Sequence, residues 1–140
     1  MITIKKQEIV KLEDVLHLYQ TVGWTNYTHQ PQMLGQALSH SLATYLARDG
    51  EEIVGLVRLV GDGFSSVFVQ DLIVLPSYQR QGIGSNLMKQ ALADYKDAYQ
   101  IQLATEQTEK NLGFYRSLGF ETLSTYDCTG MIWVDRKNLQ

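Results

Sequence analysis

The chain opens with alternating apolar and polar residues over positions 2–7, and this pattern then gives way to a helical one. Alternation with a period of two is typical of a strand, and apolar residues at i, i+3, i+4 and i+7 are typical of an amphipathic helix. The helical pattern is made by Leu12, Val15, Leu16 and Tyr19. We therefore expect a short strand followed by a helix that ends near Gly23.

The rest of the chain follows the same two periods. Pro31 favours the start of a second helix, because proline is well tolerated in the first helical turn. The predicted strands are 44–47, 53–60, 66–74, 100–104 and an antiparallel pair at 120–124 and 131–134, and the predicted helices are 82–97 and 108–118. Asp49-Gly50 predicts a hairpin turn, and Gly119 predicts a left-handed cap after the last helix.

This order of elements predicts an α/β fold, in the α+β sense of a mixed sheet with helices on its faces. The chain has 140 residues, which suits one domain over residues 1–140. Its formal net charge of −3 argues against nucleic acid as a partner, because phosphate backbones attract basic surfaces. No apolar run approaches the length of a membrane span or a signal peptide, so we expect no membrane partner and a cytoplasmic location.

The metal-binding and thiol chemistry of the sequence is sparse. Cys128 is the single cysteine, which rules out an intrachain disulfide and a cysteine-rich zinc site. We expect it to be a small buried thiol. The three histidines do not have the spacing of metal ligands, so we expect no metal.

The most informative segment joins the strand at 66–74 to the helix at 82–97. It reads Gln79, Arg80, Gln81, Gly82, Ile83, Gly84 and Ser85, and Pro76 precedes it. Glycines let a ligand approach the main chain, the start of a helix offers free N–H groups and a positive dipole end, and Arg80 adds a charge. The combination is typical of an anion cradle, for which phosphate is the natural ligand.

Spacing alone leaves the kind of ligand open. A mononucleotide P-loop requires Gly-Lys followed by Ser or Thr, which this chain lacks. A dinucleotide fingerprint requires a third glycine at position 87, where this chain has leucine. Two glycines before a helix are also compatible with a plain turn, or with a general phosphate-binding module.

Two motifs together resemble a known family. The segment Gln79-Arg80-Gln81-Gly82-Ile83-Gly84 resembles the pyrophosphate-binding motif Q/R-x-x-G-x-G/A of the GNAT superfamily of acyl-CoA N-acyltransferases. About thirty residues later, Phe114-Tyr115-Arg116-Ser117-Leu118-Gly119-Phe120 resembles that family's Phe-Tyr-x-x-x-Gly-Phe signature. The order of elements also resembles the GNAT fold, so the resemblance covers nearly the whole chain.

The resemblance implies a mostly antiparallel central sheet with a splayed parallel pair and about four helices on its faces. It also implies acetyl-CoA as co-substrate, with no metal. Main-chain groups of the strand would pair with the pantetheine arm, and the loop and helix start would hold the pyrophosphate. The cofactor-binding residues implied are Leu72, Ile73, Val74, Gln79, Arg80, Gln81, Gly82, Ile83, Gly84 and Ser85.

The resemblance further implies direct transfer of an acetyl group to a primary amine. Tyr115 would protonate the departing thiolate as a general acid, and the N–H of Val74 would stabilise the carbonyl oxygen. The general base is left open between Asp71 and Glu106, either of which can act through water. Many members of the family have a glutamate at the position of Gln70, and a glutamine there cannot act as a base.

A second departure lies in the last helix. Many members carry asparagine seven residues before the signature tyrosine, where this chain has Thr108. Thr108 would contact the cofactor through its hydroxyl or only cap the helix. Asn111 lies one turn later on the same helical face as Tyr115, and it would then compensate.

The acceptor is the part of the reaction about which the sequence says least. Trp24, Tyr27 and Tyr126 are candidate walls of its pocket, although Trp24 is equally suited to anchor the first two helices on the core. The resemblance implies a small-molecule or peptide amine and is compatible with a homodimer. A different class of function stays open, a non-catalytic acyl-CoA sensor or interaction domain that keeps the cradle and lacks a working base.

Overall fold

A computed structural model describes residues 1–133 and residue 135. The chain forms two compact units, residues 1–104 and residues 105–140. The first unit contains the sheet and the core, and the second contains the last helix. The prediction of one domain over the whole chain stays a prediction.

A five-stranded mixed sheet organises the first unit. Its strands, which lie in chain order, are β1 (Ile2–Gln7), β2 (Ala43–Asp49), β3 (Glu52–Gly61), β4 (Ser66–Val74) and β5 (Gln100–Leu103). The first four pair antiparallel, and β4 pairs parallel with β5. The predicted mixed α/β fold is confirmed.

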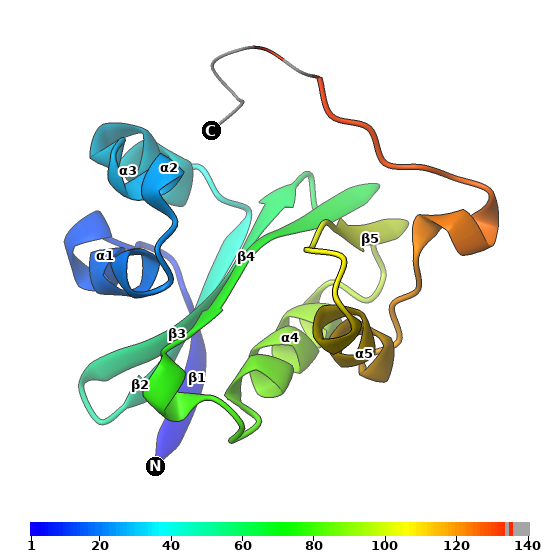
Figure 1. The fold of residues 1–140 in the computed structure, drawn as a ribbon. Coiled ribbons are helices and arrows are strands. Elements are labelled where there is room, and N and C mark those ends of the chain that lie inside the picture. Colours follow the sequence, from blue (N-terminus) through cyan, green and yellow to red (C-terminus); the bar gives the residue numbers. More distant parts are fainter. Residues whose placement is uncertain (134, 136–140) are drawn as a thin grey trace. The chain divides into compact units, whose positions relative to one another are not determined.

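Helices cover both faces of this sheet (Figure 1). One face carries α1 (Leu12–Thr21), α2 (Thr25–Thr28) and α3 (Pro31–Ser39), and the other carries α4 (Ile83–Asp94). The second unit contributes α5 (Glu109–Ser117) and a 3-10 turn, Leu123–Tyr126, and a further 3-10 turn, Pro76–Tyr78, comes after β4. No helix in residues 1–133 combines the length and apolar character that crossing a membrane requires.

A β-bulge in β4 sends its side chains to different faces of the sheet. Leu59 pairs with Val69 and Arg58 pairs with Asp71, so Gln70 is the extra residue between them. Before the bulge, Val69 faces α4, and it lines the same apolar gap as Met88 of that helix. After it, Ile73 joins the core cluster formed with α1 and α3. An unpaired residue reverses the alternation of a strand, and the reversal turns Asp71 toward α1–α3.

The parallel pair is splayed, as the resemblance implies. In the described chain, β5 pairs with β4 only from Ser66 to Val69, and β4 runs on to Val74. The edge of β4 that faces away from β3 therefore has no β5 partner over residues 70–74, and we call this stretch the open edge.

The predicted strand pair at the end of the chain is wrong within the described residues. Phe120 and Glu121 have no strand pairing, a 3-10 turn occupies Leu123–Tyr126, and residues 131–133 are not a strand. The hydroxyl of Thr122 lies 3.0 Å from that of Ser124 and 3.4 Å from that of Thr125. Such local hydroxyl contacts compete with strand pairing. Position 134, the end of the second predicted strand, lies outside the described residues.

Asp62 holds the turn between β3 and β4. Its carboxylate accepts hydrogen bonds from the Ser65 hydroxyl (2.5 Å) and from the amides of Phe64 (2.7 Å), Ser65 (2.8 Å) and Ser66 (3.1 Å). The Ser65 hydroxyl and then these amides hold the pKa of Asp62 well below its ordinary range. The ionised carboxylate therefore stabilises the hairpin that leads into β4.

We expect Asp62→Asn to lower the melting temperature at pH 7, with a deficit that narrows as the solution becomes acidic. A carboxylate with a depressed folded pKa stabilises fully above its unfolded pKa of about 4 and loses that effect as the pH falls toward its folded value. Thermal unfolding of both proteins between pH 7 and pH 2 measures this. A deficit that is constant across the range would contradict the assignment.

Candidate active site

The start of α4 presents free amide groups. Gly82 is the N-cap residue, and no side chain caps the helix there. The first hydrogen bond of the helix runs from Asn86 N to Gly82 O (2.9 Å). In the described chain, the amides of Ile83, Gly84 and Ser85 thus have no helical acceptor, which is the normal condition of a first turn. Free amides at the positive end of a helix form a site for an anion.

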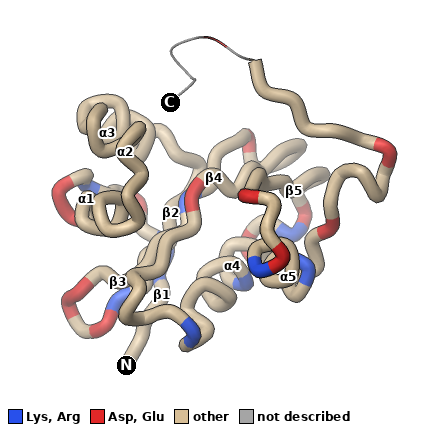
Figure 2. Tube along the Cα trace, in the orientation of Figure 1, with Lys and Arg blue, Asp and Glu red and all other residues tan. Residues whose placement is uncertain are grey.

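The loop that leads into α4 adopts two left-handed conformations, at Arg80 (φ +64°) and at Gly82 (φ +79°). A Cβ on Gly82 would meet no atom within 4 Å, so the glycine is required by its φ and not by crowding. Arg80 is exposed, and Figure 2 shows a basic position in this loop. The loop therefore combines a left-handed turn, free amides and a positive charge.

Two side chains fix the cradle loop. Gln79 donates from Nε2 to the carbonyl of Val74 (3.2 Å), and Tyr78 shares its single O–H between Asp49 at the end of β2 (2.8 Å) and Glu52 at the start of β3 (3.2 Å). Hydrogen bonding to Asp49, with smaller contributions from desolvation and Glu52, raises the pKa of Tyr78 to about 12. The phenol stays protonated and remains a donor at neutral pH, which ties the loop to β2 and β3.

The open edge of β4 presents main-chain groups of alternate residues. Leu75 donates its N–H to Val54 of β3 (2.9 Å), so the peptide groups of Val74 point the other way. By the same alternation, Leu72 directs its peptide groups toward the open edge and Ile73 directs its own toward β3. The side chain of Ile73 is buried in the core. Leu72 therefore offers a main-chain donor and an acceptor at the open edge, and Val74 offers its N–H there, since its carbonyl already accepts a hydrogen bond from Gln79.

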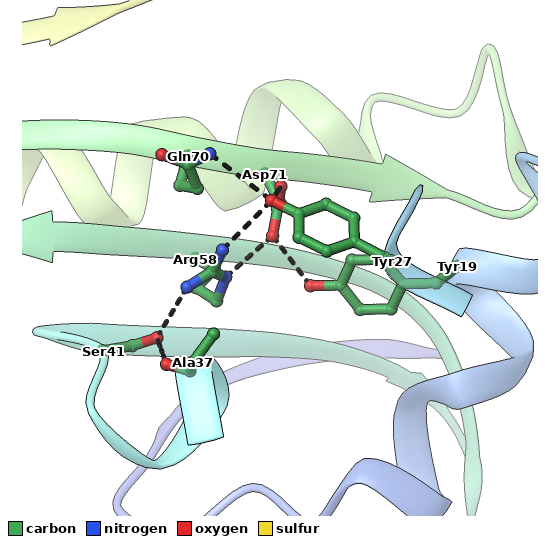
Figure 3. A network of polar contacts seen from close by, with 7 residues as sticks. All are labelled: Tyr19, Tyr27, Ala37, Ser41, Arg58, Gln70 and Asp71. Atoms are coloured by element: carbon green, nitrogen blue, oxygen red, sulfur yellow. Dashed lines mark hydrogen bonds and ion pairs between the residues drawn. The ribbon is translucent and has the colours of Figure 1, made fainter. Parts of the chain in front are cut away.

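A buried ion pair lies directly after the bulge, on the face of the sheet that α1–α3 cover (Figure 3). Arg58 donates from Nε to Asp71 Oδ2 at 2.7 Å, and the two side chains are 4% and 2% exposed. Tyr19 donates to the same oxygen (2.9 Å), and Tyr27 donates to Oδ1 (3.1 Å). Arg58 also donates to the hydroxyls of Ser41 (3.2 Å) and Tyr27 (3.3 Å). The carboxylate of Asp71 thus accepts three hydrogen bonds.

The protonation of the surrounding groups depends on burial and on that carboxylate. Burial alone lowers the pKa of Arg58, but the charge of Asp71 and its hydrogen bond raise it above the ordinary value, so the guanidinium stays charged. Burial, together with the smaller effect of the Asp71 charge, raises the pKa of both Tyr19 and Tyr27. Both phenols therefore stay protonated at neutral pH and donate hydrogen bonds to Asp71.

Three aromatic rings enclose this network on the side of α1 and α2. The ring of Tyr19 lies 5.3 Å from Tyr27 and 6.1 Å from Trp24, and the latter two rings are 6.2 Å apart. Trp24 and Tyr27 are half-buried and pack against the core cluster. Trp24 thus anchors the helices, while its role as a wall for the acceptor stays a prediction.

In the second unit, the Phe-Tyr-x-x-x-Gly-Phe signature forms a helix end. Gly119 (φ +99°) donates its N–H to Arg116 O (3.0 Å), and Phe120 donates to Tyr115 O (3.1 Å), which is the Schellman arrangement. The ring of Tyr115 contacts those of Phe114 and Phe120 at 5.0 Å and 5.9 Å. Burial raises the pKa of Tyr115, so its phenol carries a proton at neutral pH.

Thr108 caps α5, accepting a hydrogen bond from Asn111 N (3.1 Å). Thr108 therefore caps the helix, and a contact of its hydroxyl with a cofactor stays a prediction. The Asn111 amide donates to Thr105 Oγ1 (3.2 Å) and to Glu106 O (3.5 Å). These bonds fix the segment that leads into the helix, in which Glu106 is exposed.

Two further positions lie on the surface. Tyr126 is 71% exposed in the second unit, and its role at the acceptor stays a prediction. Cys128 is exposed, so the expected buried thiol is wrong, because the segment around it forms turns and no core strand. No group of three metal-ligating side chains occurs within residues 1–133 and 135.

Sequence reasoning missed Arg58 and Tyr19. Arg58 stands among the apolar residues of a central strand, and an arginine at such a position signals a buried partner. Tyr19 belongs to an apolar helical face, where a phenol requires a hydrogen-bond acceptor. Both signals, taken together with Asp71, point to the ion pair.

The family model "Acetyltransferase (GNAT) domain" matches residues 40–122. A solved GNAT-family acetyltransferase of Streptococcus pneumoniae TIGR4 is 79% identical to this chain, with 97% of this chain and 99% of that one covered and a TM-score of 0.90. A GNAT-family acetyltransferase of Elizabethkingia anophelis, solved with acetyl-CoA bound, shares the fold. It is 21% identical, with 86% and 76% covered and a TM-score of 0.63.

Among curated proteins, serotonin N-acetyltransferase 2 of Oryza sativa, a chloroplastic protein, is 33% identical over 95 residues. The match covers 65% of this chain and 48% of the rice protein. The aligned part thus spans about half the length of that relative.

Proposed function

From the premise that this chain belongs to the GNAT family of acetyltransferases, we propose that it moves an acetyl group from acetyl-CoA to a primary amine by direct transfer in a ternary complex. The observation that carries the proposal is the cradle at the start of α4, where Gly82 is left-handed and no side chain occupies the cap. A diphosphate fits such a place, because its oxygens accept from main-chain amides and its charge meets the helix dipole.

Different residues would bind different parts of the cofactor. The amides of Ile83, Gly84 and Ser85, with Arg80, would hold the pyrophosphate. Leu72, and Val74 through the second lone pair of its carbonyl, would pair with the amides of the pantetheine arm, since both direct peptide groups to the open edge of β4. Bound acetyl-CoA supplies the thioester that the amine attacks, and the N–H of Val74 would donate to its carbonyl oxygen.

Proton transfer requires an acid and a base. Tyr115 is our candidate acid, because its phenol is protonated at neutral pH and is free of hydrogen bonds within its unit as far as the structure describes it. The base is either Asp71 or Glu106. Asp71 already accepts from Arg58, Tyr19 and Tyr27, whereas Glu106 is exposed.

The rice relative's name suggests a first acceptor to test. Serotonin is an arylalkylamine, and we propose small primary amines of this kind as the starting panel, with spermidine and a tripeptide with a free N-terminus as alternatives. Release of the CoA thiol in the presence of acetyl-CoA and one of these amines would support the proposal. Binding of CoA with no thiol release across a wide panel would favour the sensor alternative.

We expect Gly82→Ala to weaken CoA binding by about tenfold, which corresponds to about 1.4 kcal/mol. An alanine at a left-handed position costs about 1–2 kcal/mol, and relief of that strain would move the amides of the cradle. Calorimetry with CoA, NAD and ATP on both proteins tests the effect and the preference for CoA. Tighter binding of NAD or ATP than of CoA would contradict the proposal.

Gly23→Ala is the matched control. Gly23 is also left-handed (φ +72°), and a Cβ on it would also meet no atom within 4 Å, but it lies between α1 and α2. The two variants should lose stability to a similar extent, and only Gly82→Ala should lose CoA affinity. Equal losses of CoA affinity in the two variants would show that the loss comes from general destabilisation and not from the cradle.

A further inference from the structure

The polar network around Asp71 runs from the core to the surface. At one end Tyr19 is fully buried, in the middle Arg58 and Asp71 are 4% and 2% exposed, and at the other end Tyr27 is half-buried. Figure 3 shows Gln70 beside the hydroxyl of Tyr27, and Gln70 is exposed. The Tyr27 hydroxyl therefore connects the buried ion pair to the exposed amide.

The Tyr27 hydroxyl has a partner for its hydrogen and for each of its two lone pairs. A phenol can donate once and accept twice. Tyr27 donates to Asp71 Oδ1 (3.1 Å), accepts from Arg58 (3.3 Å), and accepts from Gln70 Nε2 at 3.4 Å. The third contact is the longest and is made by the exposed residue. A ligand that displaces the Gln70 amide must therefore donate a hydrogen bond, since the outward side of the phenol oxygen is an acceptor.

We propose that Tyr27 Oη accepts a hydrogen bond from the N–H of the acceptor amine, and that Asp71 and Arg58 are positioning residues that hold this oxygen in place. The inference rests on the proposed N-acetyltransferase function. Tyr27 donates its O–H to Asp71, and Arg58 donates to one lone pair of the phenol oxygen, so only the second lone pair is left to face outward. Asp71 lies three residues before Val74 on β4, the strand whose open edge is proposed to hold the pantetheine arm.

This assignment separates Asp71 from the reacting atoms. Its two oxygens accept from Arg58, Tyr19 and Tyr27, and its side chain is 2% exposed. Its closest contact is the guanidinium of Arg58, whose Nε lies 2.7 Å from Asp71 Oδ2. A carboxylate in this environment orients its neighbours, and the exposed Glu106 is left as the candidate base.

The test compares Tyr27→Phe with wild type, using the amine of the panel (serotonin, spermidine or the tripeptide) that wild type turns over best. Loss of the oxygen should raise KM for the amine by about tenfold, while kcat and KM for acetyl-CoA change by less than about twofold. An unchanged KM for the amine would overturn the proposal. If wild type turns over no amine, the proposed function fails instead, and the two failures are thereby distinguished.

Tyr19→Phe is the matched control, because Tyr19 donates to the same carboxylate at 2.9 Å and is fully buried. It should lower stability and leave KM for the amine unchanged. A rise in KM equal to that of Tyr27→Phe would show that the whole network, and not the Tyr27 oxygen, is responsible. Gln70→Ala should not raise KM for the amine, since Gln70 only occupies the oxygen in the free protein, and a tenfold rise would assign the contact to Gln70.

Asp71→Asn separates positioning from base catalysis. A positioning role predicts a rise in KM for the amine, no additional rise when the change is combined with Tyr27→Phe, and a pH–rate profile that keeps its acid limb. Loss of that limb, together with a fall in kcat of about a hundredfold or more at unchanged KM, would show that Asp71 takes the proton and would overturn the assignment.

Discussion

Arg58→Met should lower the free energy of unfolding by about 3–5 kcal/mol. The substitution removes the positive charge that lies 2.7 Å from Asp71 and leaves a 2% exposed carboxylate without a compensating cation. Tyr19 and Tyr27 continue to donate to Asp71, but neutral donors do not replace the charge. Urea unfolding followed by tryptophan fluorescence or circular dichroism measures the loss.

The double variant Arg58→Met/Asp71→Leu should recover most of the stability, because replacing both members of a buried pair with apolar residues is often neutral or stabilising. Arg116→Met is the matched control. Arg116 pairs with Glu121 at 2.9 Å, but the two side chains are 51% and 38% exposed, so its loss should cost less than about 1 kcal/mol. Equal losses for Arg58→Met and Arg116→Met would refute the role given to burial.

Tyr115→Phe should reduce kcat by about a hundredfold or more while the Kd for CoA changes by less than about twofold. General acid catalysis contributes about 10²–10⁴-fold, and the phenylalanine keeps the ring contacts with Phe114 and Phe120 while removing the proton. Stopped-flow or steady-state thiol release, with calorimetry for CoA, gives the two quantities.

Tyr99→Phe serves as the comparison for Tyr115→Phe. Tyr99 is 82% exposed and is not among the predicted site residues, so loss of its hydroxyl should leave kcat close to that of wild type. If Tyr115→Phe retains full turnover, Tyr115 is not the acid, and a water molecule would have to protonate the thiolate.

Most of the first unit was predictable because its elements carry strong periodic signals. The helix predicted at 82–97 is observed at Ile83–Asp94, and the strand predicted at 66–74 is observed with those bounds. The left-handed turn before α4 was predictable too, since a glycine between a strand and a helix favours such a turn whatever lies around it. Gly82 is left-handed, as a turn into a helix of this kind requires.

The parts that were missed depend on contacts between distant residues or on competing local bonds. The pair of Arg58 and Asp71 joins neighbouring strands, and its orientation depends on the bulge at Gln70, which no local pattern marks. The predicted strand at 120–124 had suitable apolar residues, but the hydroxyls of Thr122 and Ser124 form a turn of their own. Relations of this kind cannot be read from periodicity.

The single extra residue in β4 has a consequence for how this chain can change in length. Before Gln70, odd-numbered side chains of β4 point to one face of the sheet, and after Gln70 the odd-numbered side chains point to the other face. Deleting one residue there would restore regular alternation, and the side chains of Asp71, Leu72 and Val74 would all change from one face of the sheet to the other. Insertions and deletions should therefore be tolerated in the hairpin loops but not at Gln70. This one residue determines to which face of the sheet each later side chain of β4 points.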